Sequence, residues 1–533
     1  MFKIVNVKAY FINIVCNQSN KFTKIKFRDL LLFSILAIVF GYLFSQFLFF
    51  NFKIDANLNF PTNFNYYKIL ASLLALFIFQ FYLFIIYNKL RKKKYRTLFG
   101  FMFGLGYFFF GLLWINDSMY INAGLALGLS LSACLLFAMY NALFIACAFF
   151  LAPNIFLLPF TWVLLEWLRG TLLTGFPWLS IGYGFLDTPF AGFANYIGVY
   201  GISLAALVCI NLLYYSCFKH SKRKLSILFL ILVIILTCLV NIYKPSLKQK
   251  SKLNIRVIQA GIKQNMKFDI KFIEQGINQH LDLMLQKQKV DLIITPETAF
   301  PVIIHQLPKQ ILAELNNYAA LNNTSILFGA AGVINKNYTN SLFFLRPNIS
   351  TLQIYDKYHL VPFGEFVPIG FKWFVNNLIM PMGDFARGNL VQSNFEIKNK
   401  AKFSANICYE LIFGEEMAAV NRVNQPDFFV NSTNMGWFGK EGIYQFLNMG
   451  RMRALELQKT IIISNNSGVS AIILPDGSIN KYIDVDNSGY FDDNITIYKH
   501  FNTFYSNFAN LPLLSFIAII LFVGYYQKKK NKK

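Results

Sequence analysis

The sequence predicts a polytopic α-helical membrane domain of about eight spans joined to an exported α/β domain. Charged residues make up only 14% of the 533-residue chain, whereas soluble domains contain about 25%. The deficit is concentrated in residues 30–242, which are almost continuously apolar, while residues 252–505 have the composition of an ordinary globular domain. We divide the chain into an N-terminal segment (1–29), a membrane domain (30–242), an exported domain (243–510), a last span (511–526) and a basic tail (527–533).

A helix needs about 20 apolar residues to cross a bilayer, and seven segments before residue 243 are candidates. They lie at 30–50, 68–88, 97–115, 121–150, 155–169, 195–217 and 225–242. The segment at 155–169 is the shortest. A buried core helix would explain one such segment alone, but not the whole series.

The distribution of the net charge of +24 along the chain indicates which loops lie on the cytoplasmic side of a membrane. Basic clusters lie at 21–28, 89–96, 219–224 and 528–533, whereas the alternate loops 51–67 and 116–120 contain one basic residue, Lys53. Cytoplasmic loops of membrane proteins carry such an excess of lysine and arginine. The pattern predicts a multi-pass protein with both termini in the cytoplasm and residues 243–510 on the opposite face. It also argues against nucleic acid as a partner.

Strands and helices alternate in the exported domain, which predicts a layered α/β architecture. Strand patterns lie at 253–262, 290–297, 325–334 and 427–433, helical patterns lie at 270–286, 309–321 and 442–458, and a hairpin pattern lies at 460–479. The apolar, irregular stretch 361–390 predicts a flap that dips into lipid, because long loops in compact domains are usually functional.

Cys408 is the only cysteine after residue 238 and ends the strand-like stretch "KFSANICYE". A lone thiol is either inert filler or a nucleophile, and it excludes a disulfide within this domain. We expect no metal, because no two histidines have ligand spacing and no second cysteine is present. We expect no cofactor, because the chain has no phosphate loop or dinucleotide fingerprint.

A cysteine nucleophile needs a base or a neighbouring cation. Glu297 ends the buried strand "DLIITPE" and is a candidate base, although an exposed acid at a strand end is the alternative. Lys357 in "YDKYHLVPFGE" is a candidate cation, or else a surface lysine, and Glu365 follows eight residues later. Histidine is the usual base, and only His359 lies near a candidate motif.

Three stretches, "TPET", "YDKYHLVPFGEFVP" and "ICYE", resemble in this order the Glu–Lys–Cys signature of the nitrilase superfamily. Further stretches, "EWLRGTLLTGFPWLSIGYG" (166–184), "NMGWFG" (434–439) and "MGRMRALELQKTIIISNNSGVSAIILPDG" (449–477), resemble the apolipoprotein N-acyltransferase family. The layout of seven spans, an exported domain and one closing span is also similar to that family. The resemblance extends over about residues 30 to 526.

The resemblance implies a nitrilase-like αββα sandwich and an acyltransferase of the bacterial inner membrane with a periplasmic catalytic domain. Its reaction would be the last step of lipoprotein maturation. An acyl chain would pass from a phospholipid to the amino group of an S-diacylglyceryl-cysteine by a ping-pong thioester mechanism. The family pattern makes Cys408 the nucleophile and Glu297 the general base, and Lys357 would stabilise the thiolate and the oxyanion. No cofactor is implied.

The same resemblance gives supporting roles to Glu365, Tyr409 and Glu410. It also places Phe268 where the family usually has a tryptophan, so that an aromatic platform could survive there. Trp437 matches a family tryptophan, with simple packing as its alternative.

In the membrane half, Glu166 and Arg169 are spaced to meet on one helix face. Ionisable residues at that depth are functional or structural. We expect this pair to form a lock that shapes lipid access.

Two other functions remain possible from the sequence. A membrane-anchored nitrilase-type amidase would hydrolyse a C–N bond with the same three residues and water as acceptor. A non-enzymatic membrane protein is the second possibility. The membrane motif at 166–184 and the apolar flap favour lipid transfer, and the few charged residues in the spans argue against an ion pathway.

Overall fold

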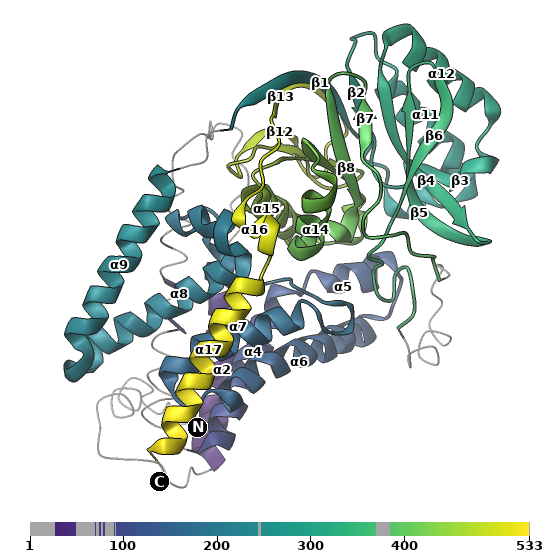
Figure 1. The fold of residues 1–533 in the computed structure, drawn as a ribbon. Coiled ribbons are helices and arrows are strands. Elements are labelled where there is room, and N and C mark those ends of the chain that lie inside the picture. The colour runs from purple at the N-terminus through teal and green to yellow at the C-terminus, as the bar shows by residue number, and fades with distance from the viewer. Residues whose placement is uncertain are drawn as a thin grey trace.

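The computed structural model describes residues 27–49, 92–243, 247–368 and 384–531, together with a few positions between 70 and 90. A helical half and a domain of two β-sheets lie end to end (Figure 1). The last helix, α17 (Leu511–Lys530), returns from the sheets along the helical half and ends far from them. Both halves agree with the predicted fold class.

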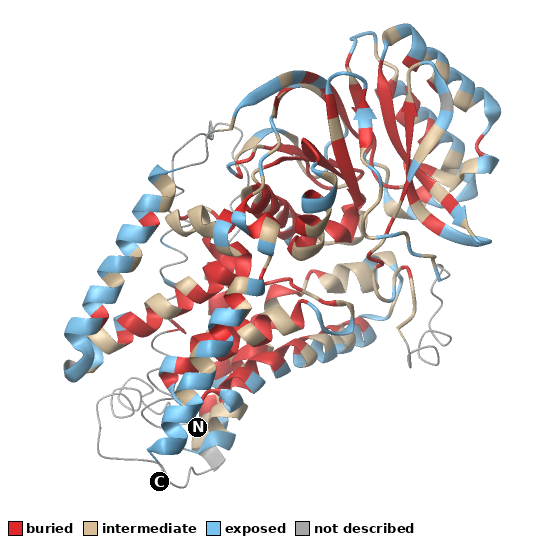
Figure 2. Cartoon of the chain, viewed as in Figure 1, coloured by how far each residue is buried: buried red, intermediate tan, exposed pale blue. Residues whose placement is uncertain are grey.

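The helical half is built from long apolar helices. Its main helices are α2 (Phe27–Leu48), α4 (Lys93–Gly111), α6 (Leu127–Leu151), α8 (Ala194–Phe218), α9 (Arg223–Ile242) and α17. Within the described residues, 5 helices are long and apolar enough to cross a membrane, or 6 if α4 and the bent segment Ile115–Asn122 form one span. Leu228 and Ile234 on α9 are each 61% exposed, as expected of a surface that faces lipid (Figure 2).

The segment 68–88 lies almost entirely outside the described residues. The segment 155–169 forms η2 (Ile155–Leu157) and the 12-residue helix α7 (Leu158–Arg169). Twelve residues extend about 18 Å, which is less than the ~30 Å of a hydrocarbon core, and α7 is mostly buried among its neighbours. The total of eight spans and the domain boundaries therefore stay predictions.

Short helices connect the long ones. They are α5 (Ile115–Asp117), η1 (Ser118–Asn122), η3 (Leu172–Thr174), η4 (Ile181–Phe185), η5 (Pro189–Phe193) and η6 (His220–Lys222).

The second half is a sandwich of two sheets. The first sheet has the order β13-β1-β2-β4-β5-β6, with β3 paired to β4, and the second has the order β12-β11-β10-β9-β8-β7. The strands of the first sheet are β1 (Gln249–Gln259), β2 (Leu292–Ile294), β3 (Phe300–Ile303), β4 (Ser325–Ile334), β5 (Asn337–Arg346), β6 (Ile349–Asp356) and β13 (Gly489–Tyr498). Those of the second are β7 (Phe395–Ile397), β8 (Ala401–Ile407), β9 (Phe428–Thr433), β10 (Thr460–Asn465), β11 (Ser470–Ile473) and β12 (Ile479–Ile483).

Helices cover both outer faces, which gives the predicted αββα order of layers. Apolar side chains of the two sheets, such as Val257 and Ile294 on one and Ile407 and Val430 on the other, form the core between them. The outer face of the first sheet is covered by α11 (Ile270–Met284) and α12 (Lys309–Asn322). The second sheet is covered by α14 (Gly414–Asn424) and α15 (Lys440–Leu457). Shorter elements are α10 (Gln264–Lys267), η7 (Ile304–Gln306), η8 (Cys408–Ile412), η9 (Met435–Trp437) and α16 (Phe504–Phe508).

The helix α15 joins the sandwich to the helical half. Phe446 and Leu447 of α15 belong to the same buried apolar cluster as Trp178 and Leu207 of the helical half, and buried residues run continuously across this junction (Figure 2). Polar groups are also paired across it. Gln445 Oε1 accepts hydrogen bonds from the indole N–H groups of Trp114 (3.0 Å) and Trp178 (2.7 Å).

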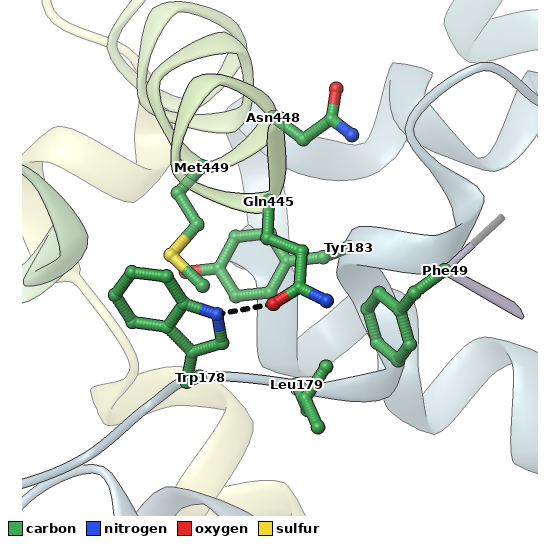
Figure 3. A pocket seen from close by; sticks show the side chains of 7 residues that line it. All are labelled: Phe49, Trp178, Leu179, Tyr183, Gln445, Asn448 and Met449. Carbon is green, nitrogen blue, oxygen red and sulfur yellow. Dashed lines mark hydrogen bonds between the residues drawn. The ribbon is translucent and has the colours of Figure 1, made fainter. Parts of the chain in front are cut away.

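The bond between Gln445 and Trp178 crosses a small pocket lined by both halves (Figure 3). A buried ion pair further along α15 makes a second polar link. Arg453 binds Glu456 at 2.9 Å, and Glu456 Oε1 accepts the backbone N–H of Val199 in α8 at 2.9 Å. The two halves are thus held by specific bonds as well as by apolar packing.

Candidate active site

The candidate nucleophile occupies a strained backbone position at the carboxyl end of β8 in the second sheet. Cys408 follows β8 directly and has φ +51°, in the left-handed region that side chains with a Cβ rarely adopt. Such strain persists only where the surroundings enforce it, and it is frequent at functional sites. Here Asn431 enforces it, since its Nδ2 donates to the carbonyl of Cys408 (3.2 Å) and to Asn406 Oδ1 (2.6 Å).

Glu297 lies after β2, in a turn that packs against β4. A Cβ added at Gly329 of β4 would lie 2.5 Å from the backbone nitrogen of Thr298 and 2.8 Å from the carbonyl oxygen of Pro296. Glycine at 329 therefore permits the close approach of the Glu297 turn. The ends of strands from the two sheets meet here, because the hydroxyl of Ser432 on β9 donates to the carbonyl of Thr295 just after β2 (2.9 Å). Glu297 therefore lies at the same end of the sandwich as Cys408, and its charge acts on the thiol.

Lys357 follows β6 and is only 1% exposed. Its Nζ lies 2.9 Å from the Glu365 carboxylate and 3.6 Å from Glu297 Oε1. The amide of Asn340 on β5 connects the two carboxylates, because its Nδ2 donates to Glu297 Oε1 (2.6 Å) and to Glu365 Oε1 (2.8 Å). Glu365 is fixed further by the backbone N–H of Val361 (2.8 Å).

Electrostatics in this cluster favour a charged lysine and a protonated thiol. Burial lowers the pKa of Lys357, but the charges of Glu365 and Glu297 outweigh it, so the net pKa lies well above the usual value. Burial and the charge of Glu297 raise the pKa of the Cys408 thiol to about 12, although Lys357 and Thr433 lower it. At neutral pH the sulfur therefore keeps its proton until a base removes it. Of the two carboxylates whose charges act on the thiol, Glu297 has a larger effect than Glu365.

Glu410 ties the cysteine turn to the lysine segment. One carboxylate oxygen accepts the N–H groups of Tyr358 (2.7 Å) and His359 (3.1 Å), and the other accepts those of Ile407 (2.6 Å) and the hydroxyl of Tyr355 (2.9 Å). Burial raises the pKa of Glu410 to about 7, although these backbone donors and Lys357 lower it. With its oxygens occupied in this way, Glu410 is placed to hold geometry.

His359, the alternative base considered from the sequence, has other partners. Its Nδ1 lies 2.7 Å from Glu416 Oε1, and its ring stacks on Phe413 with centroids 3.7 Å apart. The geometry therefore favours Glu297 over His359 as the base that serves Cys408.

Comparison with known proteins accounts for both halves. Residues 60–213 match the family model of the apolipoprotein N-acyltransferase N-terminal domain, and residues 254–491 match that of carbon–nitrogen hydrolases. An apolipoprotein N-acyltransferase of Ralstonia nicotianae is 34% identical over 81% of this chain and 85% of its own. Relatives of the same name from Nitrosomonas europaea (31%) and Haemophilus ducreyi (32%) each match 83% of this chain and 90% of their own.

This chain belongs to the apolipoprotein N-acyltransferase family. The expected resemblance is thereby confirmed, and membership favours an acyltransferase over the amidase and the non-enzymatic alternative. Within this family member, the helical half and the sandwich correspond to the two matched regions.

In this family member the motif at 166–184 reaches the turn that bears Cys408. The hydroxyl of Tyr409 donates to the carbonyl of Gly175 at 3.0 Å. Arg169 Nη1 donates to the carbonyl of Trp178 (2.7 Å), and Glu166 Oε1 accepts the N–H of Ile181 (2.8 Å). Glu166 and Arg169 thus hold the 176–181 loop.

The sequence suggested that Glu166 and Arg169 would meet each other. Within the described part of the chain no ion pair joins them, and the loop backbone instead bonds to Arg169 Nη1 and to one carboxylate oxygen of Glu166, Oε1. Both side chains bond to the loop, and their role as a structural lock stays a prediction. Its effect on lipid access stays a prediction.

The two aromatic candidates have different surroundings. Phe268 is 47% exposed and follows Lys267, whose Nζ donates to the backbone carbonyl of Glu297 at 2.8 Å. The carbonyl of Trp437 accepts from Ser118 Oγ (2.6 Å) in the helical half. Their contacts with lipid stay predictions, as does the flap, because residues 369–383 lie outside the described residues.

The sequence prediction missed Asn340 and Lys267. Asn340 sits in the alternating stretch "YTNSLFF" and looks like any polar residue of an edge strand. Lys267 is one of several lysines in a polar segment, and its 3% exposure becomes visible only in the structure. Among the described residues, no group of three His, Cys, Asp or Glu side chains is arranged to hold a metal ion.

Proposed function

We propose that this protein transfers an acyl chain from a membrane phospholipid to the free amino group of an S-diacylglyceryl-cysteine at the N-terminus of a lipoprotein. The observation that carries the proposal is the hydrogen bond from Tyr409 to Gly175. Through it the turn that bears Cys408 rests directly on the membrane half. A nucleophile held there is within reach of lipid esters that remain in the bilayer.

The first half-reaction forms a thioester. Glu297 takes the proton of Cys408 as the sulfur attacks the ester carbonyl of the phospholipid, which forms the S–C bond. The C–O bond to the glycerol then breaks, and Glu297 returns the proton to the departing alkoxide. A lysophospholipid leaves, and the acyl group stays on Cys408. Such covalent catalysis divides one difficult transfer into two easier steps.

The second half-reaction releases the acyl group to the lipoprotein. The α-amino group attacks the thioester carbonyl, Glu297 accepts a proton from the nitrogen, and the C–S bond breaks. The proton then returns to the sulfur. In both halves negative charge develops on the carbonyl oxygen, and the Lys357 ammonium with the backbone N–H of Tyr409 would stabilise it. Glu365 holds Lys357 for this task, because it binds the ammonium at 2.9 Å.

The basic clusters of the sequence and the apolar helices support a location in the bacterial inner membrane. The proposal places both termini in the cytoplasm and the sandwich on the periplasmic face. This location gives the enzyme access to both lipid substrates. Accessibility of cysteines introduced at the two ends of α9 to a membrane-impermeant reagent would test this orientation.

The decisive experiment looks for the acyl-enzyme. The protein in detergent is incubated with a phospholipid labelled in its acyl chain, without acceptor. We expect hydroxylamine-sensitive label on Cys408 that is absent in Cys408→Ala and present in the control Cys238→Ala, whose thiol is exposed on α9. A diacylglyceryl-cysteine peptide should discharge it. Folded protein that never acquires label would contradict the proposal, and hydrolysis of a small amide to a carboxylate and an amine would support the amidase.

A further inference from the structure

Lys267 is a second buried ammonium beside the proposed catalytic group Glu297. It ends the short helix α10 and is 3% exposed. Its Nζ donates to the backbone carbonyl of Glu297 at 2.8 Å. A buried charge is costly unless it is paired, yet within the described residues the hydrogen-bond acceptor of this ammonium is a neutral carbonyl. The chain therefore keeps a costly group at this place.

The segment that carries Lys267 is anchored to the site by polar bonds. Asn466 Nδ2 donates to the carbonyl of Ile262 (2.8 Å), and its Oδ1 accepts the N–H of the same residue (3.2 Å). Asn434 Nδ2 donates to Gln264 Oε1 at 2.8 Å. Both asparagines follow strands of the second sheet, so α10 is fixed across the edge where Glu297 and Cys408 lie. The ammonium is thus held in place by more than its own hydrogen bond.

The balance of charges in the site indicates what this ammonium does. Glu297 and Glu365 are two carboxylates that share the single cation Lys357. When the thiol proton moves to Glu297, one negative charge shifts to the sulfur and later to the carbonyl oxygen, while the total stays the same. With Lys267 charged, two cations face two negative charges throughout the cycle. Without it the cluster would carry an excess negative charge that opposes the thiolate.

We propose that Lys267 is a positioning residue and the second cation of the site: it orients Glu297 through its carbonyl and offsets the negative charge that forms on Cys408. This inference rests on the proposed role of Cys408 as nucleophile. The negative charges of Glu297 and of a Cys408 thiolate stabilise the Lys267 ammonium, and the ammonium stabilises those charges equally. Burial lowers the pKa of Lys267 to about 8, while Glu297 and Cys408 raise it. The group is therefore charged at neutral pH and begins to lose its proton in mildly alkaline solution.

The test measures the pH profile of Cys408 alkylation by iodoacetamide, quantified on the Cys408 peptide by mass spectrometry. The charged or titratable groups that interact with Lys267 are Glu297, Cys408 and His280. We expect Lys267→Met to move the profile to higher pH and to slow alkylation at pH 8 roughly tenfold, about one pKa unit. Lys263→Met, at an exposed lysine one turn earlier, should match the wild type.

Two further variants separate charge from packing. Lys267→Gln keeps a donor for the Glu297 carbonyl but has no charge, so it should shift the profile as Lys267→Met does. Lys267→Arg should restore it. If Lys267→Met does not fold in a thermal unfolding assay, the Gln and Arg variants decide.

A profile of Lys267→Gln that superimposes on the wild type would overturn the inference. The measurement needs no lipid. If no acyl label forms on Cys408 but the alkylation profile still shifts in the Lys267 variants, the proposed function is contradicted and the charge role of Lys267 is not.

Discussion

The hydroxyl of Tyr409 donates to the carbonyl of Gly175 at 3.0 Å, so the residue next to the candidate nucleophile is bonded to the membrane half of the same chain. Gly175 has φ +90°, and a Cβ there would lie 2.1 Å from the carbonyl oxygen of Gly170. A side chain at 175 would therefore force this loop away from the nucleophile turn.

Tyr409→Phe should reduce acyl-enzyme formation about tenfold while lowering stability by only about 1 kcal/mol. The stability loss is that of one hydrogen bond, and the larger kinetic loss arises because small misplacements of reacting groups are expensive. Single-turnover labelling and thermal unfolding in detergent measure the two effects. Tyr338→Phe, at a half-exposed tyrosine on β5, is the control. Equal rates for both variants would show that the Gly175 bond does not position Cys408.

Asn340→Leu should slow acyl-enzyme formation by about 10- to 100-fold, because both carboxylates lose their shared donor and become free to shift relative to Lys357. The side chains are similar in size, so the fold should survive. Asn337→Leu, at the exposed start of the same strand, is the matched control. An undiminished rate in Asn340→Leu would mean that Lys357 alone orders Glu297 and Glu365.

Gln445→Leu should destabilise the junction between the two halves. It leaves the indole N–H groups of Trp114 and Trp178 without their acceptor, and each buried unsatisfied group costs about 1–3 kcal/mol. Gln445→Glu keeps an acceptor oxygen, so at acidic pH, where the buried carboxyl is neutral, it should unfold at a temperature nearer to the wild type than Gln445→Leu does. The exposed Glu441→Leu on the first turn of α15 serves as control. Unchanged unfolding of Gln445→Leu would show that water replaces the lost acceptor.

The raised pKa of Glu456 predicts that the stability of the protein depends on pH. Burial raises its pKa to about 7, although Arg453 and the Val199 N–H lower it, whereas an unfolded glutamate has a pKa of about 4.3. Between these values the folded protein binds the extra proton. The contribution of Glu456 to the free energy of unfolding should therefore be greatest below about pH 4.3. It should fall as pH rises toward 7, by up to about 1.4 kcal/mol per pH unit.

The measurement is the unfolding temperature in detergent between pH 5 and 7.5. Glu456→Gln keeps an acceptor for Val199 but does not titrate, so its profile should be flatter than that of the wild type. Glu410, whose pKa is also raised to about 7, contributes a slope of the same sign that remains in this variant. A profile of Glu456→Gln that is as steep as the wild type would assign the slope to other groups.

Hydropathy and strand patterns were sufficient to predict the two halves and their order. The helical pattern at 442–458 corresponds to α15 (Lys440–Leu457), and "KFSANICYE" corresponds to β8 followed by η8. These elements are predictable because each buries one apolar face with a regular period. The motifs also brought Glu297, Lys357 and Cys408 together, and the structure places all three at one end of the sandwich.

What the sequence could not supply is the set of polar contacts made across long distances in the chain. Helical spacing put Glu166 beside Arg169, but it could not show that a loop ten residues later offers both side chains better partners. Gln445 is one polar residue in the helical pattern at 442–458, yet its Oε1 accepts hydrogen bonds from two tryptophans more than 260 residues away. Such contacts depend on the packing of whole elements, which local periodicity does not encode.

The face of α15 that turns away from its sheet is covered by the membrane half. Phe446, Leu447 and the Arg453–Glu456 pair all lie in that junction. A protein engineer who cut the chain at residue 247 to obtain a water-soluble catalyst would therefore uncover an apolar surface and a buried ion pair at once. Deleting the anchor would not be enough. Solubility would require a redesigned outer face of α15, and the loop that supports Tyr409 would have to be supplied by some other scaffold.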